Sequence, residues 1–106
     1  MLQPKCWVYV LKSASDPARY YTGVTSDWMM RIRSHNAGEN AHTSKWRPWV
    51  LDVLVRFSDE DRALAFERYL KSGSGCAFAR RHLCAERQYP RGTARMIYKS
   101  DSPRNL

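Results

Sequence analysis

Two short stretches, WVYVL at Trp7–Leu11 and YYTGVT at Tyr20–Thr25, decide the fold of this chain. Both are rich in β-branched and aromatic residues and too short for helices, which predicts buried strands over residues 6–12 and 20–25. The polar connection between them contains an Asp-Pro pair and is short, so a β-hairpin is expected. Gly23, inside the second strand, predicts either a bulge or a close approach to the backbone.

A helix is expected directly after this hairpin. Thr25 or Ser26 is the expected cap, Asp27 lies in the first turn, and Gly38 ends the helix. Three apolar residues form the arc that is expected to face the core, namely Trp28, Met29 and Ile32.

The polar residues of the same helix divide into two directions. Arg31 and His35 are four residues apart and lie together on one flank of the helix. Arg33 points about 160° away from Arg31 at 100° per residue. Only one of the two arginines can therefore face a site shared with the strands.

The rest of the chain predicts one more strand and two more helices. A mostly apolar strand covers residues 49–57, and Ser58 with the acids after it starts a helix that runs through Lys71. Gly73 and Gly75 are expected to end that helix, and a third helix covers residues 76–87 with Ser74 as its cap. The order β-β-α-β-α-α predicts an α/β (α+β) fold, with a three-stranded sheet flanked by helices.

Length and charge narrow the class of protein. The 106 residues suit one domain, expected over residues 1–87, followed by a basic tail or extension at 88–106. The net charge of +8 favours a phosphate polymer as partner, although a basic tail can also be only a solvated end. No apolar run approaches the roughly 20 residues of a membrane span, so we expect a soluble, cytoplasmic protein with reduced cysteines.

Glu67 is the most informative polar residue of the second expected helix. On the helical wheel it lies inside the apolar arc, among Ala63, Leu64 and Leu70. A carboxylate in that position is costly unless it is paired or bound to a cation. The ordinary alternative is that its side chain bends outward to Lys71, four residues later.

The sequence resembles the GIY-YIG nuclease family over about residues 6–86, in particular its small stand-alone bacterial members and the catalytic domain of excision-repair incision nucleases. Trp7-Val8-Tyr9 corresponds to the first motif triplet and Tyr21-Thr22-Gly23 to the second. The helix with RIRSHN at residues 31–36 resembles the arginine-bearing helix of the family, and AFERYLKSG at residues 65–73 resembles its glutamate-bearing helix. The first triplet departs from the pattern, because a tryptophan replaces its glycine.

This resemblance implies a metal-dependent DNA endonuclease that hydrolyses a phosphodiester bond. It implies five catalytic residues, Tyr9, Tyr21, Arg31, His35 and Glu67. Glu67 would hold one divalent ion, Mg²⁺ or Mn²⁺, and Arg31 would bind the phosphate. Tyr9 is the preferred general base and Tyr21 would orient the water or the phosphate. His35 remains a competing base or an ordinary structural histidine.

Seven further side chains are candidates for contact with DNA: Arg33, Lys45, Trp46, Arg47, Lys71, Arg80 and Arg81. Trp46 could stack on a base or simply pack beside Pro48 and Trp49, and the two arginines of the third helix could be only a solvated face. The expected partner is DNA, single-stranded, structured or duplex, bound by a monomer or a weak homodimer. The alternative function is a non-catalytic nucleic-acid-binding module on the same scaffold.

Overall fold

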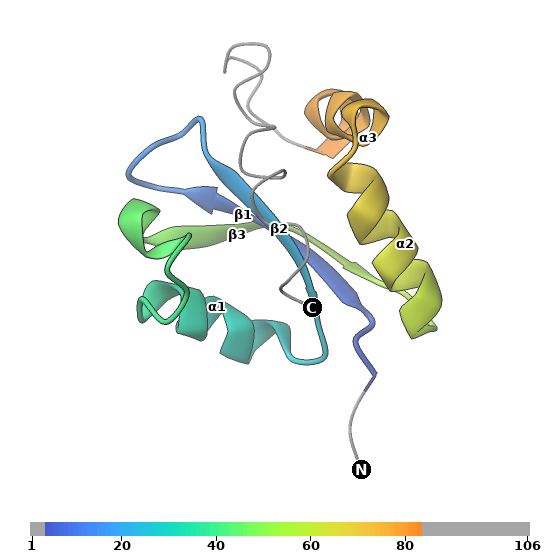
Figure 1. Ribbon diagram of the computed structural model, residues 1–106, viewed down its shortest axis with the longest axis horizontal. Helices are drawn as coiled ribbons and strands as arrows, with labels where there is room; N and C mark the ends of the chain where they lie inside the picture. Colours follow the sequence, from blue (N-terminus) through green and yellow to red (C-terminus); the bar gives the residue numbers. More distant parts are fainter. Residues whose placement is uncertain (1–3, 84–106) are drawn as a thin grey trace.

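A three-stranded antiparallel sheet in the order β2-β1-β3 is the centre of the computed structural model, which describes residues 4–83 (Figure 1). β1 (Trp7–Ser13) and β2 (Tyr20–Thr25) form the predicted hairpin. β3 (Trp49–Arg56) pairs with the other side of β1, so β1 is the middle strand and β2 lies at an edge. The Cα register shifts once along the β1–β3 pair, between Val10 and Leu11.

Helices flank this sheet on both sides (Figure 1). α1 (Trp28–Asn36) lies on one side, and α2 (Glu60–Leu70) and α3 (Gly73–Phe78) lie on the other. A 3₁₀ turn, η1 (Ser44–Trp46), precedes β3, and a π-helical turn, η2 (Ala79–Leu83), follows α3. These elements confirm the α+β class and the predicted order of strands and helices.

The helix starts differ from the predicted ones by one or two residues. Asp27, rather than Thr25 or Ser26, caps α1, because its carboxylate accepts a hydrogen bond from the backbone N–H of Met30 at 3.1 Å. Asp59, rather than Ser58, caps α2 in the same way. In both places the residue after the predicted cap has the carboxylate that reaches the third N–H of the helix.

The turn between α2 and α3 was predicted wrongly. Ser72 caps α3, and Gly73 and Gly75 lie inside that helix instead of separating it from α2. A Cβ at Gly75 would lie 2.8 Å from the Cα of Leu70, so the two helices meet too closely for any larger residue there. The rest of the predicted third helix beyond residue 83, and the predicted tail at 88–106, lie outside the described residues.

The core lies along both faces of β1, and α1 contributes less apolar surface to it than predicted. Val8, Leu11 and Tyr20 are fully buried, and Ile32 of α1 packs against them. Met29 is 55% exposed, so its predicted place in the core-facing arc is wrong. The buried residue of α1 is His35, and the helix turns toward it and away from Met29. Between residues 4 and 83, no helix has the length and apolar character that crossing a membrane requires.

Candidate active site

The hairpin register places both predicted catalytic tyrosines on one face of the sheet. Tyr9 of β1 lies opposite Gly23, and Tyr21 of β2 lies opposite Leu11. Directly opposed residues of an antiparallel pair share a face, and the two tyrosine ring centroids are 6.0 Å apart. A Cβ at Gly23 would come within 2.6 Å of Tyr9 Cζ. The glycine therefore marks the predicted close approach, in which the ring of Tyr9 lies over the edge strand.

A polar cleft of about 160 Å³ opens at this edge of the sheet. Its lining residues come from β1, β2, α1, α2 and the loop after α1: Tyr9, Tyr21, Gly23, Val24, Arg31, Asn40 and Glu67. One lining residue, Val24 of the edge strand β2, belongs to the face of the sheet opposite to that of the two tyrosines, so the cleft borders both faces. This position lets α2 deliver Glu67 to the tyrosines although the helix packs on the other side. Four of the five predicted catalytic residues thus meet in one place.

His35 joins the cleft indirectly, from behind Tyr9. Its side chain is 1% exposed, and its Nε2 lies 3.1 Å from the Tyr9 hydroxyl. Its Nδ1 lies 2.9 Å from the Thr43 hydroxyl, and its ring centroid is 4.6 Å from that of Tyr21. The result is a buried chain of hydrogen bonds that runs from Tyr9 through His35 to Thr43.

The protonation of this chain follows from burial and charge. Burial, and secondly the nearby Arg31 guanidinium, lower the pKa of His35 from 6.5 to about 4, so the imidazole is neutral at pH 7. The Thr43 hydroxyl can donate to the Asn40 carbonyl, 3.5 Å away, and its oxygen then accepts from the N–H at His35 Nδ1. This arrangement leaves Nε2 as the acceptor for the Tyr9 hydroxyl.

The structure separates the two arginines of α1 as the helical wheel predicts. Arg31 is half-buried and lines the cleft, whereas Arg33 is exposed. Both also border a second hollow, of about 440 Å³, along the outer flank of α1. Arg31 is therefore the guanidinium that a phosphate in the cleft would meet.

Glu67 lies on the buried face of α2, with Ala63 and Leu70, as the wheel predicts. Its Oε2 is 2.6 Å from the Nζ of Lys71, and the side chains of Glu67 and Lys71 are only 5% and 10% exposed. The alternative interpretation of an ordinary i,i+4 pair is thus half correct. The pair forms, but Glu67 stays inside the molecule and Lys71 follows it.

The donor set of the cleft suits a hard cation. Across residues 4–83, no three His, Cys, Asp or Glu side chains gather into a metal-binding group. Among the residues that line the cleft, Glu67 is the one carboxylate, accompanied by the oxygens of Tyr9, Tyr21 and Asn40. Mg²⁺ and Mn²⁺ fit such a site because they accept oxygen ligands and keep several waters, which substrate phosphates can replace. Zn²⁺ prefers three or four His, Cys or carboxylate ligands and does not fit.

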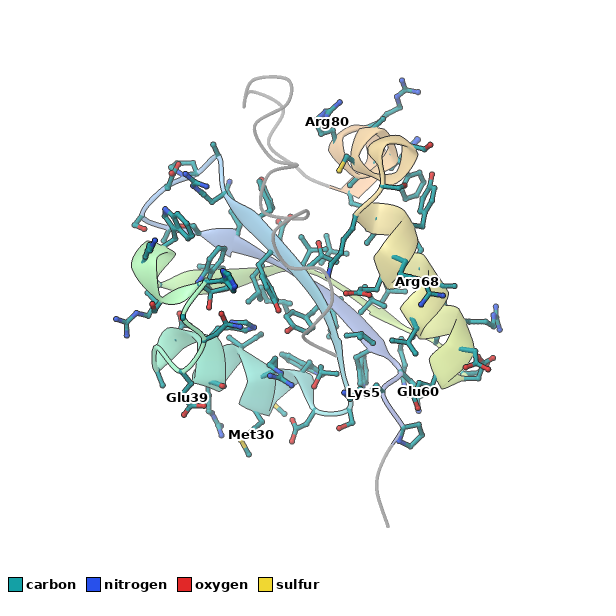
Figure 2. The ribbon with its side chains drawn as sticks, in the orientation of Figure 1. Lys5, Met30, Glu39, Glu60, Arg68 and Arg80 are labelled. Carbon is teal, nitrogen blue, oxygen red and sulfur yellow. The ribbon has the colours of Figure 1, made fainter. Side chains whose placement is uncertain are left out.

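The side chains predicted to contact DNA are spread over the surface. Arg33 borders a hollow next to the cleft together with Arg31. Lys71 lies beside the cleft because it is paired with Glu67. Lys45 within η1 and Arg47 directly after it are exposed. Arg80 and Arg81 belong to η2, which lies at the end of the molecule away from α1 (Figure 2).

Trp46 follows the packing interpretation. Its ring packs against the core and is partly buried. The guanidinium of Arg19 lies 4.2 Å from the ring centroid, and Lys45 Nζ lies 5.6 Å from it. Two cations therefore lie against the ring on which a base would stack.

Sequence reasoning missed two residues of the site. Thr43 is fully buried, and its hydroxyl lies 2.9 Å from His35 Nδ1. Asn40 lines the cleft, and its side-chain oxygen accepts a hydrogen bond from the N–H of His42 at 2.8 Å. The one available signal was this Asn-x-His-Thr pattern, which is typical of a turn capped by the asparagine side chain. It would have predicted a tight turn directly after α1.

Comparison with known proteins gives one family and several relatives. The family model of the GIY-YIG catalytic domain matches residues 5–76. The structure-specific endonuclease subunit SLX1 of Candida dubliniensis is 40% identical over an alignment of 83 residues that covers 72% of this chain and 28% of that protein. The SLX1 homolog of Giardia intestinalis is 39% identical over an alignment of 66 residues that covers 58% of this chain and 18% of that protein.

A UPF0213 protein of Staphylococcus haemolyticus is 37% identical over 71 residues, which are 66% of this chain and 84% of that protein. The similarity thus spans less than a third of the length of the two SLX1 relatives but most of the UPF0213 protein. No solved structure gives a significant match.

Proposed function

The chain belongs to the GIY-YIG nuclease family, and from this membership we propose that it is an endonuclease that hydrolyses phosphodiester bonds of DNA with one divalent metal ion. The observation that carries the proposal is the shared cleft of Tyr9, Tyr21, Arg31 and Glu67, which come from four different elements. A general base, a cation for the phosphate and a carboxylate for a metal are the groups that this hydrolysis needs.

Tyr9 is the proposed general base. Its hydroxyl donates to His35 Nε2, so its oxygen acts as an acceptor toward the cleft. Burial and Arg31 lower the pKa of His35 to about 4, so transfer of the Tyr9 proton to the imidazole is unfavourable before the attack. Tyrosinate therefore does not accumulate at rest. Tyr9 takes the proton of the water as it passes its own to His35, within the step of attack.

Negative charge develops during hydrolysis on the phosphoryl oxygens and on the leaving oxygen, and the charged groups of the cleft stabilise it. Arg31 binds the non-bridging phosphoryl oxygens and stabilises the charge that grows on them. Glu67 would hold the metal ion, which, when bound, supplies Lewis-acid stabilisation of the leaving oxygen. Tyr21, whose ring lies tilted against that of His35, orients the phosphate or the water.

We propose single-stranded or structured DNA as the substrate. A cleft of about 160 Å³ accommodates one phosphate with its flanking atoms, which a flexible single strand can present. The SLX1 relatives are named structure-specific endonucleases, which is consistent with this preference. The exposed cations Arg33, Lys45, Arg47 and Arg81 would contact the backbone beyond the cleft.

The alternative function is a nucleic-acid-binding module without catalysis. It is favoured by the ion pair of Glu67, since that carboxylate is already neutralised by Lys71. Such a module would bind DNA in a salt-dependent manner, and Glu67→Gln would leave the affinity unchanged.

Cleavage of labelled single-stranded, duplex and branched DNA, with Mg²⁺, Mn²⁺ or EDTA, separates the two functions. We expect metal-dependent cleavage that falls by about 10²–10³ or more in Glu67→Gln and Arg31→Ala, because each removes a charge that acts in the transition state. The matched control is Arg68→Ala, an exposed residue next to Glu67 on α2 (Figure 2). If the wild type cuts no faster than Glu67→Gln, the nuclease proposal fails and the binding module remains.

A further inference from the structure

The ion pair between Glu67 and Lys71 is unusual for neighbours four residues apart on a helix. Such pairs ordinarily lie in water, where they contribute little and exchange freely. Here Nζ and Oε2 are 2.6 Å apart and both side chains are almost completely buried. The ammonium therefore occupies the neighbourhood of the carboxylate that the proposed function assigns to the metal.

We propose that Lys71 holds the place of the divalent metal on Glu67 and that metal binding requires its displacement. The inference rests on the proposed function, because it takes Glu67 as the metal ligand. An ammonium and a divalent ion compete for the same carboxylate, and in a buried cleft their repulsion is poorly screened. The empty enzyme is thereby kept electrically balanced and its affinity for metal is kept low.

The chemistry of lysine suits a cation that must leave. Its charge lies at the end of a flexible four-carbon stem, so Nζ can swing away while the α2 backbone stays in place. Lys71 is the C-cap of α2, directly after the last helical residue, Leu70. A DNA phosphate would then become the next partner of the displaced ammonium, which is the contact that the sequence predicts for Lys71.

Mn²⁺ titration of the full chain without DNA, followed by electron paramagnetic resonance of the unbound ion, tests this proposal. We expect Lys71→Met to bind Mn²⁺ at least about 10-fold more tightly than the wild type, because the competing charge is gone. Arg68→Met is the matched control, since it removes the same charge from the same helix outside the cleft and should leave the affinity unchanged. The double variant Glu67→Gln/Lys71→Met should lose the gain.

A second readout covers the risk that Lys71→Met folds poorly, since it leaves Glu67 buried without its cation. We expect Mn²⁺ to raise the melting temperature of Lys71→Met, and of the more polar variant Lys71→Gln, by more than it raises that of the wild type. Equal Mn²⁺ affinity in folded Lys71→Met and the wild type overturns the proposal. So do variants that stay unfolded at millimolar Mn²⁺, because an ion that replaces Lys71 must restore the fold.

These outcomes are independent of cleavage. If the wild type cuts no DNA and Lys71→Met nevertheless gains Mn²⁺ affinity through Glu67, the proposed nuclease function fails while the competition between Lys71 and metal stands. If the wild type cuts DNA and the affinities are equal, the nuclease function stands and the competition fails.

Discussion

The two sides of the cleft are built in different ways. The tyrosine side is a chain of hydrogen bonds from Tyr9 through His35 to Thr43, with the ring of Tyr21 beside His35, and Tyr9 and His35 are 26 residues apart in the sequence. The glutamate side, made of Glu67 and Lys71, is a pair of opposite charges four residues apart at the end of one helix.

The tyrosine side is therefore the rigid side of the cleft, and the glutamate side is the adaptable one. The tyrosine side exists only when β1, α1 and the loop after α1 are all in place, so its geometry is fixed by the whole domain. The glutamate side depends on one helix and can change by the rotation of a single lysine side chain. Proton transfer requires fixed distances, whereas the entry of a metal requires a partner that can move.

Loss of the Tyr9 hydroxyl is the most damaging change to the tyrosine side. We expect Tyr9→Phe to lower kcat by about 10²–10⁴ with little change in KM, because it removes the proposed general base while the phosphate contacts remain. The measurement is single-turnover cleavage of single-stranded DNA, with Tyr69→Phe on α2 as the partly exposed control. Cleavage within tenfold of the wild type would remove Tyr9 from the role of base.

The buried imidazole makes the stability of the tyrosine side depend on pH. Because the pKa of His35 is lowered from 6.5 to about 4, protons bind the unfolded chain more readily than the folded one between these values. This contribution to stability is complete above pH 6.5 and decreases as the pH falls to about 4. The total loss is about 3 kcal/mol, from roughly 1.4 kcal/mol per pH unit.

Urea unfolding at a series of pH values measures this loss as the difference between the wild type and His35→Gln. Other groups titrate in the same range and cancel in that difference. His42→Asn, which removes an exposed histidine, should follow the wild-type profile. Parallel profiles for the wild type and His35→Gln would mean that His35 is as easily protonated in the folded protein as in the unfolded chain.

The far end of the hydrogen-bond chain should have the smallest effect. Thr43→Val keeps the shape of the side chain but leaves the N–H at His35 Nδ1 without its acceptor, which should cost about 1–2 kcal/mol of unfolding free energy. Ser44→Ala changes a neighbouring hydroxyl outside the chain and should stay within about 0.5 kcal/mol. Equal unfolding free energies for Thr43→Val and Ser44→Ala would show that the chain ends at His35.

The predictable parts of the molecule are those that depend on local pattern. The strand composition and the hairpin turn predicted β1 and β2, and helical periodicity predicted both the inward position of Glu67 and the choice of Arg31 over Arg33. Each of these follows from the repeat of one element and from which of its faces is apolar. The roles of these residues remain proposals.

The parts that sequence reasoning missed depend on the tertiary arrangement. Met29 was placed in the core because it is apolar, yet α1 rotates to bury the polar His35, which gains two hydrogen bonds there. Gly75 was interpreted as a helix end, whereas it permits the close contact of α3 with α2. The link of His35 to Tyr9 and Thr43 joins three segments and has no local signature.

The position of β1 in the middle of the sheet has a consequence for how the protein is made. Translation proceeds from the N-terminus, so β1, β2 and α1 leave the ribosome first, and β3 must return to the open side of β1 before the sheet is complete. Glu67 follows β3 in the chain, on α2. A nascent or truncated chain that ends before α2 therefore lacks the carboxylate that the proposed cleavage requires.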